Sequence, residues 1–303
     1  MDGIWLTAVP SRLNGTDLTA DEFRDNLRLR YNLVPLHMPE RCNGCGEKMT
    51  VEHALSCKVG GLVHIRHDDV AEEWGRLCAK AFSPSCVTHE PYINSGERRR
   101  GGADARGQPT TPQATGDTAA AGDPAARGNT AGGRAEREGT RGDTPQNPYV
   151  AESENRGDKG CHGFWKGGRG CVFDVRLTDT ECRSTRNQDP EKVLDRCEKQ
   201  KKDKHLAACH ERRKDFTPLV YSVDGMAGRE TKLAERRLAS KLAEKWGREY
   251  SEMVGFVRTK MTMSVIRANT LLVRGSRQRR RGGLPCIEDG AAMMGWHHWR
   301  ERH

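Results

Sequence analysis

The sequence lacks long runs of apolar residues. Hydrophobic residues make up 35% of its 303 residues, and the mean hydropathy is −0.83, so part of the chain is expected to pack no core. No stretch approaches the length of a membrane-spanning helix, and the N-terminus has no sustained apolar run of the kind that forms a signal peptide. We therefore expect an intracellular protein that makes no membrane contact.

Large apolar residues are missing altogether between Ile93 and Val150, where the sequence contains no Val, Leu, Ile, Met, Phe or Trp. Such a segment cannot bury enough apolar surface to offset the entropy that it would lose on ordering. Residues 94–149 are therefore predicted to form a long disordered insertion or linker.

Acidic residues are fewer than basic ones, with 42 Asp+Glu against 51 Lys+Arg and a formal net charge of +9. A basic excess of this size favours a polyanionic partner, most often nucleic acid, although many soluble proteins are basic without binding one. A dense basic run follows residue 273 and includes Arg279, Arg280 and Arg281. This run is either a solvated tail or a segment that contacts phosphates.

A disulfide framework is not expected, because the 11 cysteines are odd in number and no secretory signal precedes them. Four candidate ligands cluster instead in CNGCGEKMTVEHALSC. The C-x2-C turn aims Cys42 and Cys45 at one point, and His53 and Cys57 are four residues apart, on one face of a helix. This spacing predicts a tetrahedral zinc site; the alternative is four unrelated reduced side chains.

Helical and strand patterns occur on both sides of the linker. Thr19 and Glu22 form a capping box for a helix whose apolar face carries Phe23 and Leu27. A helix is also predicted over 66–82, with Val70, Trp74, Leu77 and Ala81 at helical spacing. A strand is predicted over 171–179, where Phe173, Val175 and Leu177 alternate with Val172, Asp174, Arg176 and Thr178. Beyond it the sequence predicts a long helix capped by Asp189 with Pro190 first, a strand from 216 with Pro218 at a sheet edge, and two helices, one with Ala234, Leu238, Leu242 and Trp246 and one with Met253, Val257, Met261, Val265, Ala268 and Leu272.

Two acids, Asp158 and Asp174, form a second pattern with chemical meaning. Asp174 lies in the middle of the predicted strand, on the same face as Arg176. An acid two residues before a basic residue is typical of the PD-(D/E)xK nuclease core, in which two carboxylates hold a divalent metal that activates water. The same short pattern is also common as a surface ion pair.

The long helix predicted from residue 190 carries lysines in its apolar seam. The seam runs through Leu194, Cys197, Lys201, Lys204 and Ala208. Burying an unpaired ammonium group is unfavourable. Lys201 and Lys204 therefore either point at an acidic metal site or extend to solvent at a partly exposed face.

These motifs occur together, and in the same order, in a known family. The chain resembles the C-terminal portion of reverse-transcriptase polyproteins of non-LTR retrotransposons, which carries a CCHC zinc knuckle followed by a restriction-like endonuclease. The resemblance covers nearly the whole chain outside the linker and rests on these stretches: WLTAVPSRLNGTDLTADEFRDNLRLRY, CNGCGEKMTVEHALSCKVGGLVHIRHDDV, FWKGGRGCVFDVRLTDTE, KQKKDKHLAAC and RRKDFTPLVYSVDGMAGRE.

The resemblance implies roles for individual residues. It implies structural Zn²⁺ at the four Cys and His ligands, and Mg²⁺ or Mn²⁺ at the acids. The family motifs fall on the Arg-His pair Arg66 and His67, which we expect to contact DNA, on the acids Asp158 and Asp174 with the basic residue Arg176, and on the lysine-rich helix at Lys201, Lys202 and Lys204. The zinc knuckle is then expected to brace the Arg66–His67 helix against the acids.

Two departures from the family pattern concern the same site. The residues after Asp158, DKGCHGFW, include Gly160 and Gly163 and predict a poor strand. Failure of this strand would misplace the first acid. His205 stands where the family usually has an aromatic residue.

The implied fold is α+β or α/β, a restriction-endonuclease-like core with a zinc knuckle and a long insertion. The expected organisation is an N-terminal helical segment that links to an absent polymerase (1–40), the knuckle and first nuclease helix (41–93), the linker (94–149), the nuclease core with C-terminal helices (150–275) and a basic tail (276–303). The chain has no Tyr-x-Asp-Asp polymerase motif.

The implied function is to nick DNA so that reverse transcription can be primed, in the nucleus. The expected partners are DNA, the element's own RNA and a covalently joined reverse transcriptase. The alternatives are a degenerate copy of such a module, a non-functional remnant, and a non-catalytic zinc-dependent protein that binds nucleic acid.

Overall fold

The computed structural model describes residues 3–93 and 156–278, which belong to one compact unit. The predicted linker over 94–149 and most of the predicted basic tail lie outside the described residues. The elements, in chain order, are η1 (Ile4–Leu6), α1 (Ala20–Arg30), α2 (Val51–Ser56), α3 (Leu62–Ala81), η2 (Pro84–Cys86), β1 (Val87–His89), β2 (Lys159–His162), β3 (Gly170–Thr178), α5 (Pro190–Glu211), β4 (Asp215–Ser222), α6 (Arg229–Trp246) and α7 (Tyr250–Arg274).

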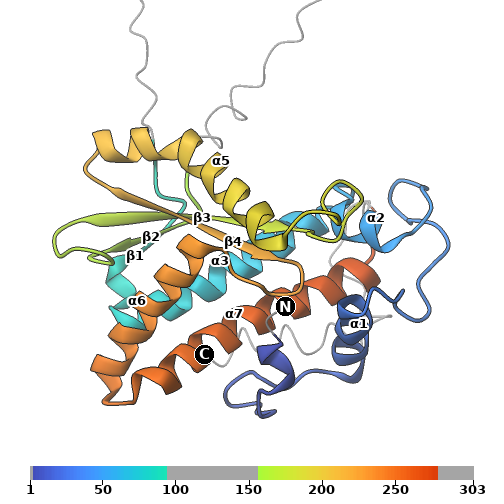
Figure 1. The fold of residues 1–303 in the computed structure, drawn as a ribbon, viewed down its shortest axis with the longest axis horizontal. Coiled ribbons are helices and arrows are strands. Elements are labelled where there is room, and N and C mark those ends of the chain that lie inside the picture. Colours follow the sequence, from blue (N-terminus) through green and yellow to red (C-terminus); the bar gives the residue numbers. More distant parts are fainter. Residues whose placement is uncertain (1–2, 94–155, 279–303) are drawn as a thin grey trace, which may run out of the picture. The chain divides into compact units, whose positions relative to one another are not determined.

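A mixed sheet of four strands lies at the centre of the fold, in the order β1-β2-β3-β4. β1, β2 and β3 pair antiparallel, whereas β3 and β4 pair parallel and are joined through α5. Helix α5 covers one face of the sheet, and α3 and α6 cover the other, with α7 packed beneath them (Figure 1). The prediction of a mixed α/β fold is confirmed. Pro218 lies in β4 at a sheet edge, as predicted.

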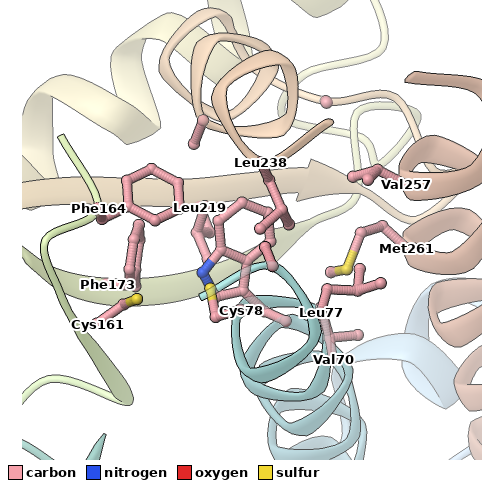
Figure 2. Packing of buried hydrophobic residues seen from close by; sticks show 14 of the residues in the cluster. Val70, Leu77, Cys78, Cys161, Phe164, Phe173, Leu219, Leu238, Val257 and Met261 are labelled. Carbon is pink, nitrogen blue, oxygen red and sulfur yellow. The ribbon is translucent and has the colours of Figure 1, made fainter. Parts of the chain in front are cut away.

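The main core fills the space between the sheet and the helices α3, α6 and α7 (Figure 2). Phe173 and Val175 of β3 point into it, while Val172 packs on the opposite face with residues of α5 and β4. The predicted alternation of β3 is therefore confirmed, and both of its faces are covered. The apolar stripes predicted for α3, α6 and α7 are buried except for Trp246, which is 41% exposed at the last turn of α6.

The N-terminal segment, predicted to be a helical linker, packs against α7. The capping box of Thr19 and Glu22 forms as predicted. The predicted apolar face forms in part: Leu27 is partly buried against Trp5 and Ile266, whereas Phe23 is 43% exposed and packs edge-on against Trp5. The fully buried residues of α1 are Asp25 and Asn26. Asn26 donates hydrogen bonds to the Ile266 carbonyl and to Thr270, so polar contacts attach this helix to α7.

The strand after Asp158, predicted to be poor, forms as β2. Its central residue Gly160 pairs with Thr88 on one side and Val172 on the other. A Cβ atom at position 160 would overlap the Thr88 hydroxyl, so the absence of a side chain allows the strands to approach. Gly163 follows the strand at a φ of 77°, which glycine adopts without strain. Gly160, which argued against a strand, is thus the residue that lets β1 and β2 approach.

Candidate metal centres

The four predicted zinc ligands meet in one cluster between the start of the knuckle and α2. The Cys42 and Cys57 sulfurs are 4.0 Å apart, the Cys45 and Cys57 sulfurs are 3.9 Å apart, and Cys45 Sγ lies 3.3 Å from His53 Nε2. A tetrahedral zinc ion with Zn–S bonds of about 2.3 Å places its sulfurs about 3.8 Å from one another. The cluster of Cys42, Cys45, His53 and Cys57 can therefore hold zinc.

Local hydrogen bonds shape this cluster. The Thr50 hydroxyl caps α2 by accepting from the His53 amide at 3.0 Å, which fixes the helix that carries His53. Burial alone would raise the pKa of the Cys42 thiol, but hydrogen bonds from the Cys45 backbone and from His53 lower it to about 6. A thiol with this pKa is largely thiolate at neutral pH, the form that binds metal.

The segment after α7 closes over the knuckle. Arg277 is 1% exposed, and its Nη2 donates to the carbonyls of Ala54 in α2 and Leu272 in α7. Its backbone amide donates to Asn43 Oδ1 at 3.0 Å, within the C-x2-C turn. Residue 277 fell in the predicted basic tail, but Arg277 is an internal anchor that joins the knuckle to two helix ends.

A second cluster lies at the junction of α3, β2 and β3 and contains His67, Asp158 and Asp174. His67 Nε2 lies 3.0 Å from Asp158 Oδ2, and His67 Nδ1 lies 3.2 Å from Asp68 Oδ1. The Val175 amide donates to Asp158 Oδ2 at 2.5 Å. Candidate ligand atoms of the three residues all lie within 4.8 Å of one another.

Helix α5 supplies two basic side chains to the same cluster. Lys201 Nζ lies 2.8 Å from Asp174 Oδ2, and His205 Nε2 lies 3.4 Å from the same oxygen. Lys201 and His205 are four residues apart, so they share one face of α5. Asp174 is 5% exposed, so the ammonium of Lys201 is the charge that lies against its buried carboxylate.

The charges of this cluster shift one another. Burial raises the pKa of Asp174 to about 6, and Lys201 acts in the opposite direction. Burial opposes charge on His67, but hydrogen bonding to Asp158 and the charge of that residue raise the pKa of His67 to about 9. Burial and the charges of Lys204 and Lys201 lower the pKa of His205 to about 4, so this imidazole is neutral at neutral pH.

Other predicted site residues lie elsewhere. Of the two alternatives for Lys204, the structure shows the exposed one: Lys204 lies at the surface, and His205 takes the buried position because the buried face of α5 continues from Lys201 in a step of four. Arg176 donates to Gln200 at 2.8 Å at the edge of the cluster. Lys202 pairs with Glu230 and does not reach the acids. Arg279, Arg280 and Arg281 lie outside the described residues.

Arg66 does not face solvent, contrary to the expectation that it contacts DNA. It is 6% exposed, and its Nε and Nη1 atoms are buried without a hydrogen-bond partner among the described residues. Burial lowers its pKa to about 10, with the charge of Asp179 acting in the opposite direction. His67, its neighbour on α3, points at Asp158.

Sequence reasoning missed His205 and Arg277 as parts of the two centres. His205 was noted only as a departure from the aromatic residue of the family, and its spacing of four from Lys201 was the signal that could have placed it. No local pattern distinguishes Arg277 from the arginines that follow it. Its burial depends on contacts with residues more than 200 positions away.

The fold and the two clusters define a mixed α/β protein that combines a Cys/His cluster able to bind metal with a second cluster of carboxylates, imidazoles and an ammonium group. No protein-family model matches the chain, and no curated protein matches its sequence. Within residues 3–93 and 156–278, every helix is too short or too polar to cross a membrane.

Proposed function

We propose that this protein is a metal-dependent DNA endonuclease of the restriction-like type, derived from a non-LTR retrotransposon. The observation that supports it best is the convergence of Asp158, Asp174 and Lys201. Asp158 lies directly before β2 and Asp174 lies in β3, with 15 residues between them in sequence, and the lysine comes from α5 on the covered face of the sheet. An ion pair on the surface would need no such convergence, and Asp174 is buried.

The donor set suits a divalent cation at this cluster. Carboxylate oxygens of Asp158 and Asp174 are the ligands that Mg²⁺ and Mn²⁺ prefer. A cation held there supplies Lewis-acid stabilisation of phosphoryl charge and lowers the pKa of bound water. Lys201 is placed to donate to a phosphate oxygen beside Asp174, and Arg176, whose guanidinium stays protonated, can hold a second one.

The test is nicking of supercoiled plasmid in the presence of Mg²⁺ or Mn²⁺. Asp174→Ala should reduce the nicking rate at least about 100-fold, because it removes both a metal ligand and the partner of Lys201. Asp195→Ala is a matched control, since Asp195 is an exposed acid on α5. Equal nicking by the wild type and Asp174→Ala would overturn the catalytic assignment.

The second candidate function is zinc-dependent nucleic-acid binding without catalysis. One observation favours it: the acids already have partners, since Asp158 Oδ2 accepts from the Val175 amide and pairs with His67, and Asp174 pairs with Lys201. Calorimetric titration of the zinc-loaded protein with Mn²⁺ separates the two candidates. A nuclease centre binds Mn²⁺ in the wild type and not in Asp174→Ala, whereas a simple binding protein gives no difference.

A further inference from the structure

The acidic cluster contains an imidazole, that of His67, which comes from neither the sheet nor α5. It projects from α3, and its Nε2 atom lies 3.0 Å from Asp158 Oδ2. It also forms part of the group of three residues whose ligand atoms lie within 4.8 Å of one another. Its side chain is 31% exposed, so it borders the cluster and solvent at once.

The second ring nitrogen of His67 shows how the imidazole is held. Nδ1 lies 3.2 Å from a carboxylate oxygen of Asp68, the next residue along α3. Histidines that bind metals usually donate their other N–H to a carboxylate, carbonyl or water, which fixes the tautomer and the orientation of the ring. The contact with Asp68 thus leaves Nε2, on the side of Asp158 and Asp174, as the metal-binding nitrogen.

We propose that His67 Nε2 is a direct ligand of the divalent metal at Asp158 and Asp174, so that the centre is a mixed nitrogen and oxygen site that binds Mn²⁺ and similar transition metals more tightly than Mg²⁺. This inference deepens the proposed function, because it concerns the metal of that same centre. Imidazole suits transition metals, whereas Mg²⁺ keeps oxygen ligands and water. Metal binding would require Nε2 to release its proton to solvent and give up its hydrogen bond with Asp158, after which the neutral imidazole can donate the Nε2 lone pair to the cation.

His205 is the competing candidate for a nitrogen ligand. Its Nε2 lies 3.4 Å from Asp174 Oδ2, but Lys201 Nζ is nearer to the same oxygen, at 2.8 Å. Two cationic side chains of α5, Lys201 and Lys204, also act on His205. The ammonium of Lys201 therefore lies closer to Asp174 than this imidazole does, whereas both ring nitrogens of His67 contact carboxylates, those of Asp68 and Asp158.

The test uses the full chain loaded with Zn²⁺ at the Cys/His cluster and titrated with Mn²⁺, which does not displace zinc from thiolates. Electron spin-echo envelope modulation of bound Mn²⁺ reports a directly coordinated nitrogen. We expect nitrogen modulation in the wild type, its loss in His67→Gln, and its retention in the matched variant His205→Gln. Glutamine supplies an oxygen in place of the nitrogen, so His67→Gln should weaken Mn²⁺ binding about tenfold and leave Mg²⁺ binding within about twofold.

A second variant checks the orienting contact. Asp68→Asn should weaken Mn²⁺ binding about tenfold while the nitrogen modulation remains, because the ring is less well held but still coordinates. Modulation that survives in His67→Gln and disappears in His205→Gln would overturn the proposal, as would Mn²⁺ binding without any nitrogen modulation. Metal-dependent nicking with an all-oxygen centre would leave the proposed function standing and refute this inference. A nitrogen-bound Mn²⁺ centre that nicks no DNA would support this inference and refute the proposed function.

Discussion

At the scale of single residues, Arg277 is a buried arginine that joins the knuckle to two helix ends. Its guanidinium donates to the free carbonyls near the ends of α2 and α7, and its amide binds Asn43 in the knuckle turn. Gly44 and Gly60 pack directly against its backbone and Cβ. The carbonyls at helix ends have no partners within their own helix and carry partial negative charge, so a buried cation is well matched to them.

Substitution of Arg277 by alanine should lower the free energy of unfolding by about 3 kcal/mol, because hydrogen bonds from a charged group to two buried carbonyls are lost. Urea denaturation followed by circular dichroism measures the change. Gln278→Ala is the control, since Gln278 is exposed next to it, and its effect should stay within about 0.5 kcal/mol. An Arg277→Ala protein as stable as the wild type would show that the guanidinium is not an anchor.

At the scale of elements, the position of β2 depends on the lack of a side chain at Gly160. Gly160 lies between β1 and β3, and a Cβ atom there would overlap Thr88 and lie 3.3 Å from Pro91 Cγ. Gly157, just before Asp158, packs in the same way against Val172. These close approaches determine where Asp158 enters the sheet, and so where the first acid lies relative to Asp174.

Gly160→Ala should destabilise the protein by about 1–3 kcal/mol, since an added methyl group must push β1 away. Gly170→Ala is the control in the same sheet, because a Cβ atom there meets only Lys214 Cγ at 3.9 Å. Removing the Thr88 hydroxyl in the double variant Gly160→Ala, Thr88→Ala should recover part of the loss. Thermal denaturation of the wild type, of the single variants Gly160→Ala and Thr88→Ala, and of the double variant measures the coupling. Strictly additive effects would contradict a direct clash.

The elements predicted from the sequence are those with periodic apolar residues or caps. Thr19, Asp189 and the stripes of α3, α6 and α7 each carry a local signal that the fold retains. β2 was mispredicted because β propensity describes side chains on a pleated surface, and here the neighbouring chains needed room instead. The sequence does not decide whether Lys204 or His205 follows Lys201 on the buried face of α5. Steps of three and of four are equally helical, and only packing against β3 decides between them.

At the scale of the whole molecule, the Cys/His cluster joins parts of the chain that are far apart in sequence. Its turn binds residues 276 and 277 after α7, and its α2 helix packs on α7. Two glycines after Cys57 lead directly into α3, which carries His67 toward Asp158. The predicted role of the knuckle as a brace for this helix is consistent with these contacts. The four ligands were predictable because their spacing is local, whereas their attachment to residue 277 was not.

Removal of zinc should therefore affect the molecule well beyond the knuckle. We expect purified protein to contain close to one zinc per chain by mass spectrometry of the metal, and Cys57→Ser to contain little. Cys182→Ser is the matched control, since Cys182 is a partly exposed thiol that binds Ser184 and Thr185 outside the cluster. A structural zinc contributes its binding free energy to folding, so chelation should lower the thermal midpoint of the wild type and of Cys182→Ser but leave Cys57→Ser unchanged.

Hydrogen exchange locates the effect of that zinc loss. Because Arg277 and Asn43 connect the knuckle to the end of α7, chelation should increase amide exchange in α2, in the first turns of α3 and in the last turns of α7. Exchange in β3 and α6 should change less, since both lie in the main core. Exchange that increases only within residues 42–57 would show that the knuckle is an independent finger. Increased exchange in the first turns of α3 and in the last turns of α7 would show that the cluster stabilises the attachment of both helices, and with it the position of His67.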